Sequence, residues 1–377
     1  MKIAISTLVT PIDKSGIGNY VLNLLSSLQR IDHENEYFVF VGQDTRVLFA
    51  LTSPNFHLIE TRFRFEPRWI MRPLYYVWQN TLVSRHLARC KVDLLHLPNL
   101  CPLFIRHRPT VVTIPDLTEH MVAKYTALRQ AYRKMLPYLT ARTASHIITI
   151  SESSKNDIVS ATGLDPSKVT VTHLAPGIPN PGSADNLDSA IRRYGIGERY
   201  FLHVGGALPH KNLSGVISAY ATLRAQHNVD YQLVLVGNKN TAAAQRMIES
   251  AGLGGRGCVI QTGYITDEEL SAIYCRASAL VFPSFYEGFG LPILEAMVRG
   301  VPVITSKVSS LPEVAGDAAM LVDPMRSDEI ARAMHSVTKD RTLRNEMIER
   351  GRVQASQFSW ERCASETINT YKSVLEL

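Results

Sequence analysis

Two carboxylates stand close together in the segment of this chain that carries the sharpest chemical signal. Residues 284–297 read SFYEGFGLPILEAM and contain Glu287 and Glu295, with two glycines between them. Carboxylates at such places could accept hydrogen bonds from the hydroxyl groups of a sugar. The alternative is structural, with Glu287 a solvated loop residue and Glu295 a first-turn carboxylate that the helix dipole favours.

The same segment predicts a helix that starts directly after a strand and a short loop. Pro292 suits the first turn of this helix, because proline lacks an N–H group that would have no partner there. The loop then presents the N–H groups of Gly290 and Leu291 at the helix N-terminus. Free amides and the helix dipole together attract an anion, typically a phosphate.

A lysine marks the second candidate site. Residues 204–213 read VGGALPHKNL, in which two glycines allow close backbone approach and Lys211 and Asn212 stand at the start of a predicted helix. A lysine at a helix N-terminus opposes the dipole, so it makes sense if an anion lies between the two. The alternative is an ordinary solvated lysine.

A third glycine motif lies near the N-terminus. Residues 14–20 read KSGIGNY and resemble half of a dinucleotide-binding fingerprint, but Val21 occupies the third glycine position, so NAD binding is weakly supported. The turn at Gly16 and Gly18 either brings backbone amides toward a ligand or simply joins a strand to a helix.

Other catalytic patterns are missing from the sequence. No Asp-x-Asp pair at a strand end, no His, Cys and carboxylate cluster with metal-ligand spacing and no Gly-x-Ser-x-Gly elbow occurs. We therefore expect Lys211 and helix N-termini, without Mg²⁺, to neutralise a bound diphosphate. Three histidines follow apolar runs near predicted strand ends, namely His96, His120 and His210.

The elements that must position these residues alternate between apolar runs and amphipathic segments. The apolar runs lie at 2–10, 37–41, 92–97, 110–114, 146–150, 200–204, 232–236, 258–261, 280–283 and 301–305. Runs bounded by turns and separated by helical periods predict doubly wound parallel α/β sheets. The length of 377 residues corresponds to about two domains.

A segment rich in proline and glycine, 175–183, is the best linker candidate. We expect a domain over 1–178 and a second over 184–359, with an amphipathic helix over 360–377. In pairs of doubly wound domains the ligand lies between the domains, outside the carboxyl ends of the strands.

The composition suits several classes of binding partner and does not distinguish among them. The formal net charge of +6 suits nucleic acid, anionic lipid or small phosphorylated ligands. Residues 62–78 form a basic aromatic stretch, RFRFEPRWIMRPLYYVW, which suits a membrane interface, single-stranded nucleic acid or plain packing under a loop. Five scattered cysteines, no apolar run of about 18 residues and no signal-peptide cleavage signature favour the cytosol.

Taken together, the motifs resemble the retaining glycosyltransferases of family 4, whose GT-B fold has two Rossmann-like domains. The resemblance covers nearly the whole chain and is strongest over 200–324. Its most specific part is the Glu-x7-Glu motif, here Glu287 to Glu295, followed by GVPVI at 300–304 and LPEV at 311–314.

The resemblance implies roles for the matching residues. Glu287 would hold the donor sugar, Glu295 the ribose hydroxyls, and Lys211 the departing diphosphate, while the last helix would cross back onto the N-terminal domain. The implied donor-binding residues are Gly16, Gly18, Gly206, Lys211, Asn212, Tyr264, Ile265, Glu287, Phe289, Gly290, Leu291 and Glu295. The implied catalytic residues are Lys211, Glu287, Asp116 and His120.

Two departures from the family pattern stand out. Many members carry His-Asp-Leu in the N-terminal domain, whereas here Pro115 precedes Asp116 and Leu117. Either another group, such as His120 or His96, substitutes for the histidine, or the contact is dispensable. Many members also carry an arginine before the lysine, at a position near Gly206 here.

The resemblance implies transfer of a hexose, with retention, from a nucleotide-diphosphate sugar to a glycan hydroxyl, without a metal or other cofactor. GDP-mannose is the favoured donor, with UDP-glucose or a dTDP-sugar as alternatives. The acceptor would be a glycan or a polyprenyl-linked saccharide at the inner face of the cytoplasmic membrane, and no nucleic acid is expected. A sugar-nucleotide epimerase of the same fold and a non-catalytic nucleotide-sugar binding protein are the competing classes.

Overall fold

The computed structural model describes residues 1–8, 16–64, 79–103, 109–118, 127–177, 189, 191–227, 229–237, 241–255 and 257–376. The chain divides into two compact units, Met1–Leu174 with Ser359–Leu377, and Ala175–Phe358. Three of the sequence predictions lie wholly or mostly outside the described residues: His120, the linker at 175–183 from residue 178 on, and the basic aromatic stretch at 62–78 beyond residue 64.

The first unit is built on a seven-stranded parallel sheet in the order β3-β2-β1-β4-β5-β6-β7, counted over its described residues. The strands are β1 (Lys2–Ser6), β2 (Glu36–Val41), β3 (Phe56–Glu60), β4 (Leu94–Leu97), β5 (Thr110–Thr113), β6 (His146–Thr149) and β7 (Val169–Val171). The central strands β4, β5 and β6 are buried along their whole length, as expected for a sheet covered on both faces.

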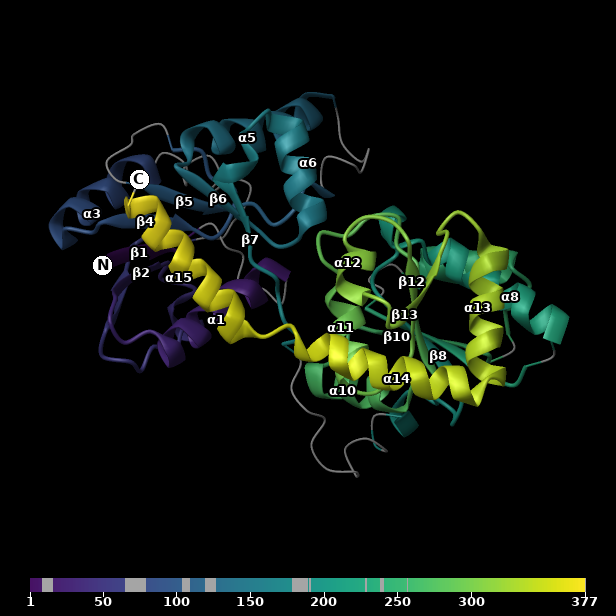
Figure 1. The fold of residues 1–377 in the computed structure, drawn as a ribbon. Helices are drawn as coiled ribbons and strands as arrows, with labels where there is room; N and C mark the ends of the chain where they lie inside the picture. The colour runs from purple at the N-terminus through teal and green to yellow at the C-terminus, as the bar shows by residue number, and fades with distance from the viewer. Residues whose placement is uncertain are drawn as a thin grey trace. The chain divides into compact units, whose positions relative to one another are not determined.

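Helices cover this sheet, and the last one comes from the far end of the chain. They are α1 (Gly16–Ile31), η1 (Arg46–Leu48), η2 (Gln79–Val83), α3 (Ser84–Cys90), α5 (Ala127–Thr143), α6 (Glu152–Thr162), η3 (Pro166–Lys168) and α15 (Trp360–Glu376). The C-terminal helix α15 lies alongside α1, where the ring of Trp360 lies 6.4 Å from that of Tyr20 (Figure 1).

Within the part of the second unit that the structure describes, six strands form a parallel sheet in the order β10-β9-β8-β11-β12-β13. Its strands are β8 (Tyr200–Val204), β9 (Gln232–Val236), β10 (Val259–Gly263), β11 (Ala279–Phe282), β12 (Val303–Ser306) and β13 (Ala319–Val322). Its helices are η4 (Pro209–Lys211), α8 (Leu213–His227), α9 (Thr241–Ser250), α10 (Asp267–Arg276), α11 (Leu291–Val298), α12 (Leu311–Ala315), α13 (Ser327–Lys339) and α14 (Arg341–Ser356).

The helices of this unit form two layers. The pair α8 and α13 packs together on one side of the sheet, and α11 packs against α14 (Figure 1). A core between α8, α13 and the strands contains fully buried Val216, Tyr220 and Met334. Among the helices that the structure describes, none combines the length and the apolar composition that crossing a bilayer requires.

The structure confirms the predicted parallel α/β class. Each of the ten predicted runs overlaps a strand, although the boundaries shift by a few residues. Three strands were missed, namely β3, β7 and β13, and each lies at the edge of its sheet. Their side chains are mostly half-buried or exposed, so they form no continuous apolar run.

Candidate functional site

Two loops meet at the point where the strand order of the second sheet reverses. β8 and β11 are neighbouring parallel strands, but the chain leaves β8 toward β9 on one side and leaves β11 toward β12 on the other. In open α/β sheets, ligands bind outside the carboxyl ends of the strands at such a point. The loop after β8 carries Lys211, and the loop after β11 carries Glu287.

Lys211 and Glu287 form an ion pair across these two loops. The Lys211 Nζ atom lies 2.8 Å from both carboxylate oxygens of Glu287. The side chains are 20% and 12% exposed, so solvent screens the pair less than it would screen a surface pair. A backbone hydrogen bond from Phe285 N to His210 O, at 2.7 Å, joins the loops beside the pair.

The stem of Lys211 lies on a glycine. Gly205 has φ +151°, and a Cβ atom there would lie 3.4 Å from Lys211 Cδ. The ammonium group lies 5.2 Å from the centre of the Phe282 ring, within the range of a cation–π contact. Behind them, buried His203 hydrogen-bonds through Nδ1 to Val281 O at 2.9 Å, and burial lowers the pKa of His203 to about 4.

Asn212 holds the surroundings of the site together. It is 3% exposed and adopts the left-handed conformation with φ +55°. Its side-chain amide donates to Pro283 O at 3.0 Å and to Pro324 O at 2.7 Å, and its carbonyl accepts from Gly215 N. Both amide hydrogens are therefore used by the protein's own backbone, so Asn212 is a positioning residue in this structure.

Two serines fix the backbone of Glu287. Ser309 Oγ donates to Glu287 O at 2.6 Å and accepts from Glu287 N at 3.2 Å, and Ser310 Oγ donates to the same carbonyl at 2.9 Å. Ser309 has φ +60°, a conformation that costs a non-glycine residue energy. These serines directly precede the LPEV string of α12, and no motif in the sequence marks them.

The loop after β11 ends in the predicted helix N-terminus. Gly290 is the N-cap residue of α11 with φ +108°, and a Cβ there would lie 2.7 Å from Leu311 Cδ2, so only glycine fits. Among the residues that the structure describes, no acceptor receives the N–H group of Gly290 or of Leu291. These amides point from a helix start, where an anion is favoured.

Glu295 lies inside α11 and is 7% exposed. Its Oε2 atom accepts a hydrogen bond from the fully buried Tyr274 hydroxyl at 2.9 Å. Burial raises the pKa of Glu295 to about 7, against the opposing effects of Tyr274 and the nearby Arg299 guanidinium. Tyr274 was not predicted as a site residue, because nothing in the sequence shows that α10 packs beside α11.

The remaining predicted donor-site residues of this unit lie on neighbouring loops. Tyr264 follows β10 and is 64% exposed, and Ile265 is half-buried. Gly206 lies beside the loop after β9, since a Cβ there would lie 3.6 Å from Gly237 O. Phe289 is buried and packs edge-on against Phe358.

In the first unit, the glycine motif and the departures from the family pattern have clear positions. Gly16 and Gly18 lie in the first turn of α1, so the predicted loop at these glycines is helical in the structure. Pro115 and Asp116 follow β5, and Asp116 Oδ1 accepts from Thr118 N at 2.8 Å.

His96 is not available to replace the missing histidine. It is fully buried in β4, where Nε2 hydrogen-bonds Thr113 Oγ1 at 2.9 Å and Nδ1 hydrogen-bonds the Tyr371 hydroxyl of α15 at 2.6 Å. Burial lowers the pKa of His96 to about 3. His96 therefore anchors the C-terminal helix to the sheet and does not reach a ligand.

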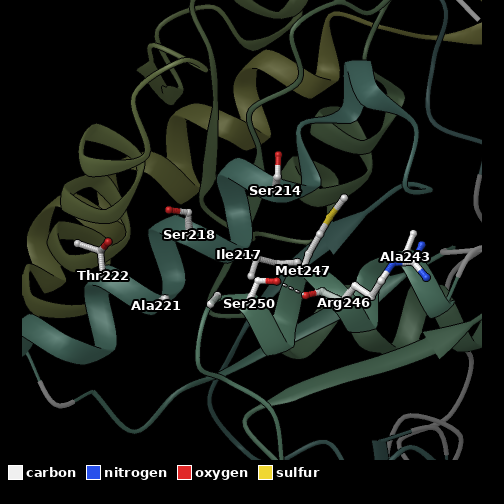
Figure 2. A pocket seen from close by; sticks show the side chains of 10 residues that line it. Ser214, Ile217, Ser218, Ala221, Thr222, Ala243, Arg246, Met247 and Ser250 are labelled. Carbon is white, nitrogen blue, oxygen red and sulfur yellow. Dashed lines mark hydrogen bonds between the residues drawn. The ribbon is translucent and has the colours of Figure 1, made fainter.

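A pocket of about 540 Å³ lies elsewhere in the second unit, between α8 and α9 (Figure 2). Ile217 and Ser218 line it from α8, and Arg246, Met247 and Ser250 line it from α9. No predicted site residue lines this pocket, and its walls are two helix faces with mostly small side chains. The candidate site therefore lies on the loops after β8 and β11.

The assembled groups suit an anionic ligand that also carries hydroxyl groups. Lys211 and the amides at the start of α11 supply positive charge and donors, while Glu287 and Glu295 supply acceptors. Within the described ranges, no group of three or more His, Cys, Asp or Glu residues is arranged to hold a metal ion.

Two family descriptions match the chain. Residues 14–175 match "Glycosyltransferase Family 4", and residues 189–354 match "Glycosyl transferases group 1". An O-antigen chain mannosyltransferase B from Escherichia coli is 35% identical over 285 residues, which is 74% of this chain and 73% of that protein.

The chain is also similar to part of a longer protein and to a solved structure. The serotype-specific mannosyltransferase WbdA of Escherichia coli is 31% identical over 62% of this chain, which covers only 29% of WbdA. The solved structure of Anabaena HepE in complex with UDP and glucose superposes with a TM-score of 0.73 at 18% identity, covering 99% of this chain and 100% of that one. This last likeness supports the same fold of two Rossmann-like domains.

Proposed function

We propose that this chain, which belongs to the family 4 glycosyltransferases, transfers mannose from a nucleotide-diphosphate donor to a hydroxyl group of a glycan. The contact between Lys211 and Glu287 carries the proposal. It brings together the one cation and one of the two carboxylates that the family motif predicts for the donor, at the edge of the sheet where such folds bind ligands.

The proposed chemistry centres on the leaving diphosphate. The bond between the anomeric carbon and the phosphate oxygen breaks, the acceptor oxygen bonds to the same face of that carbon, and the acceptor proton passes to the departing phosphate. Lys211 and the N–H groups of Gly290 and Leu291 would stabilise the charge that develops on the diphosphate. Their positions are fixed before the reaction, so little reorganisation is required.

The substrates are inferred from chemistry and from the relatives. Glu287 would accept hydrogen bonds from the transferred sugar, and Glu295 from the ribose. GDP-mannose is the proposed donor because the chain is similar to several mannosyltransferases, among them those of Escherichia coli. The proposed acceptor is a polyprenyl-linked saccharide at the cytoplasmic face of a membrane.

A transfer assay tests this proposal against its two competitors. The purified protein is incubated with GDP-mannose, UDP-glucose or a dTDP-sugar, each with and without a polyprenyl-linked saccharide acceptor. Transfer from GDP-mannose that requires the acceptor supports the proposal. An epimerised sugar nucleotide formed without acceptor identifies an epimerase, and tight donor binding without any transfer identifies a binding protein.

A further inference from the structure

The Lys211–Glu287 pair poses an electrostatic problem for any phosphate that binds there. A phosphate that approaches the Lys211 ammonium must share it with a carboxylate whose two oxygens already lie 2.8 Å away. A carboxylate at this distance repels a second anion, and the low exposure of both side chains limits screening by water.

The loop that carries the carboxylate is held in place. The Glu287 backbone is held by hydrogen bonds from Ser309 and Ser310. The Lys211 stem is held against Gly205, and the Phe282 ring lies beside its ammonium group. The ligand therefore meets both charges of the pair at once.

The nucleoside diphosphate and the nucleotide-diphosphate sugar would interact differently with the Glu287 carboxylate. The terminal phosphate of a nucleoside diphosphate carries a charge of about −1.5 to −2 at pH 7. Once it is esterified to a sugar, it keeps a single negative charge and brings hydroxyl groups that can donate to a carboxylate. The bare diphosphate offers no such donor, and the carboxylate also repels its additional negative charge of about 0.5 to 1.

We propose that Glu287 makes the site select the nucleotide-diphosphate sugar over the nucleoside diphosphate, and so speeds release of the nucleotide product. This inference rests on the proposed function, because it assumes that the pair meets the diphosphate of a sugar nucleotide. It assigns to Glu287 a role in product discrimination beside its contact with the donor sugar.

Isothermal titration calorimetry tests the inference with GDP, GDP-mannose, UDP and UDP-glucose as ligands. The Glu287→Gln variant keeps the size of the side chain and removes its charge. We expect it to bind the nucleoside diphosphate about tenfold more tightly than the wild type and the sugar nucleotide no more tightly. Glu349→Gln, an exposed carboxylate on α14, is the matched control with the same change in net charge and should bind as the wild type does.

A second variant covers the case in which Glu287→Gln fails to fold, which a thermal melt reveals. Lys211→Gln leaves the carboxylate without its cation, so it should weaken binding of the diphosphate more than binding of the sugar nucleotide. Equal or weaker diphosphate binding by Glu287→Gln, or equal losses for both ligands in Lys211→Gln, overturns the inference. No binding of any nucleotide by the wild type overturns the proposed function itself.

Discussion

At the scale of single residues, the proposed mechanism requires Lys211 to stabilise the negative charge on the leaving diphosphate. Removing one preorganised donor to a developing anion typically lowers kcat by about 10²–10³. We predict a loss in this range for Lys211→Ala in initial-rate assays, with an unchanged fold by circular dichroism. Lys339→Ala, an exposed lysine in the last turn of α13, is the control and should retain full activity. Wild-type turnover by Lys211→Ala would remove Lys211 from the mechanism.

The buried carboxylate of Glu295 gives a pH-dependent prediction. Its pKa is raised from 4.5 to about 7 by burial, so ionising it costs the folded state free energy as the pH rises from 4.5 to 7. Glu295→Gln removes that cost. A pKa shift of this size corresponds to a cost of about 3 kcal/mol at most. The variant should be more stable than the wild type at pH 8, and the difference should shrink toward pH 5.

Urea denaturation at several pH values measures this difference. The comparison between two proteins that differ at one position cancels the titration of all other groups. A stability difference that stays constant from pH 5 to pH 8 would show that Glu295 does not titrate in this range. Glu295 is proposed to accept hydrogen bonds from the ribose hydroxyl groups of the donor. Glu295→Gln should therefore also bind the donor more weakly.

At the scale of elements, Asn212 links the loop after β8 to the ends of β11 and β13. Asn212→Ala leaves two buried carbonyl groups without their donor, which we expect to cost roughly 2–5 kcal/mol of stability. Asn212→Gly loses the same bonds but tolerates φ +55°, and it should therefore be less destabilising by about 1 kcal/mol. Equal losses in the two variants would exclude backbone strain as a contribution.

The C-terminal helix depends on its polar anchor in the first unit. Tyr371→Phe removes the hydroxyl group that hydrogen-bonds buried His96 and leaves that ring nitrogen without a partner. We predict a loss of about 1–3 kcal/mol in the free energy of unfolding, measured by chemical denaturation. Lys372→Ala changes the exposed side of the same helix and should be nearly neutral.

The strands of the two sheets show which elements can be predicted from the sequence. Central strands such as β8 and β9 were predicted at their observed bounds, because strands buried on both faces form unbroken apolar runs. The edge strands β3, β7 and β13 were missed, since half-solvated strands lack that signal.

For the site, motif chemistry predicted Lys211 and Glu287, and the structure places them in contact. The comparisons confirm the family that these motifs indicated. Tyr274 and Ser309 were not predicted, because they act through contacts between elements that are distant in sequence. Of the groups considered as replacements for the missing histidine, His96 is excluded by its burial under α15, which the sequence does not show.

At the scale of the whole molecule, the charge is divided unevenly between the two units. The first unit has 22 basic and 16 acidic residues, and the second has 18 of each, so the first carries the whole excess of +6. An excess of positive charge attracts anionic lipid headgroups, and salt screens that attraction.

We therefore predict that the protein floats with vesicles that contain anionic phospholipid and not with neutral vesicles. Binding should fall as salt rises from about 0.05 to 0.5 M, because the Debye length shortens several-fold. Equal flotation, or equal failure, with both vesicle types would contradict a charge-driven membrane contact.

The central claim is that Lys211 and the N–H groups at the start of α11 stabilise the diphosphate as it leaves the sugar. The acceptor then bonds to the face of the anomeric carbon from which the phosphate departs. Proton NMR of the anomeric region, recorded while the protein acts on GDP-mannose and a polyprenyl-linked acceptor, tests it most directly. We predict a product with the α configuration of the donor, formed by the wild type and strongly reduced in Lys211→Ala. A β-linked product, or the same α-linked product at the same rate without Lys211, would contradict the account.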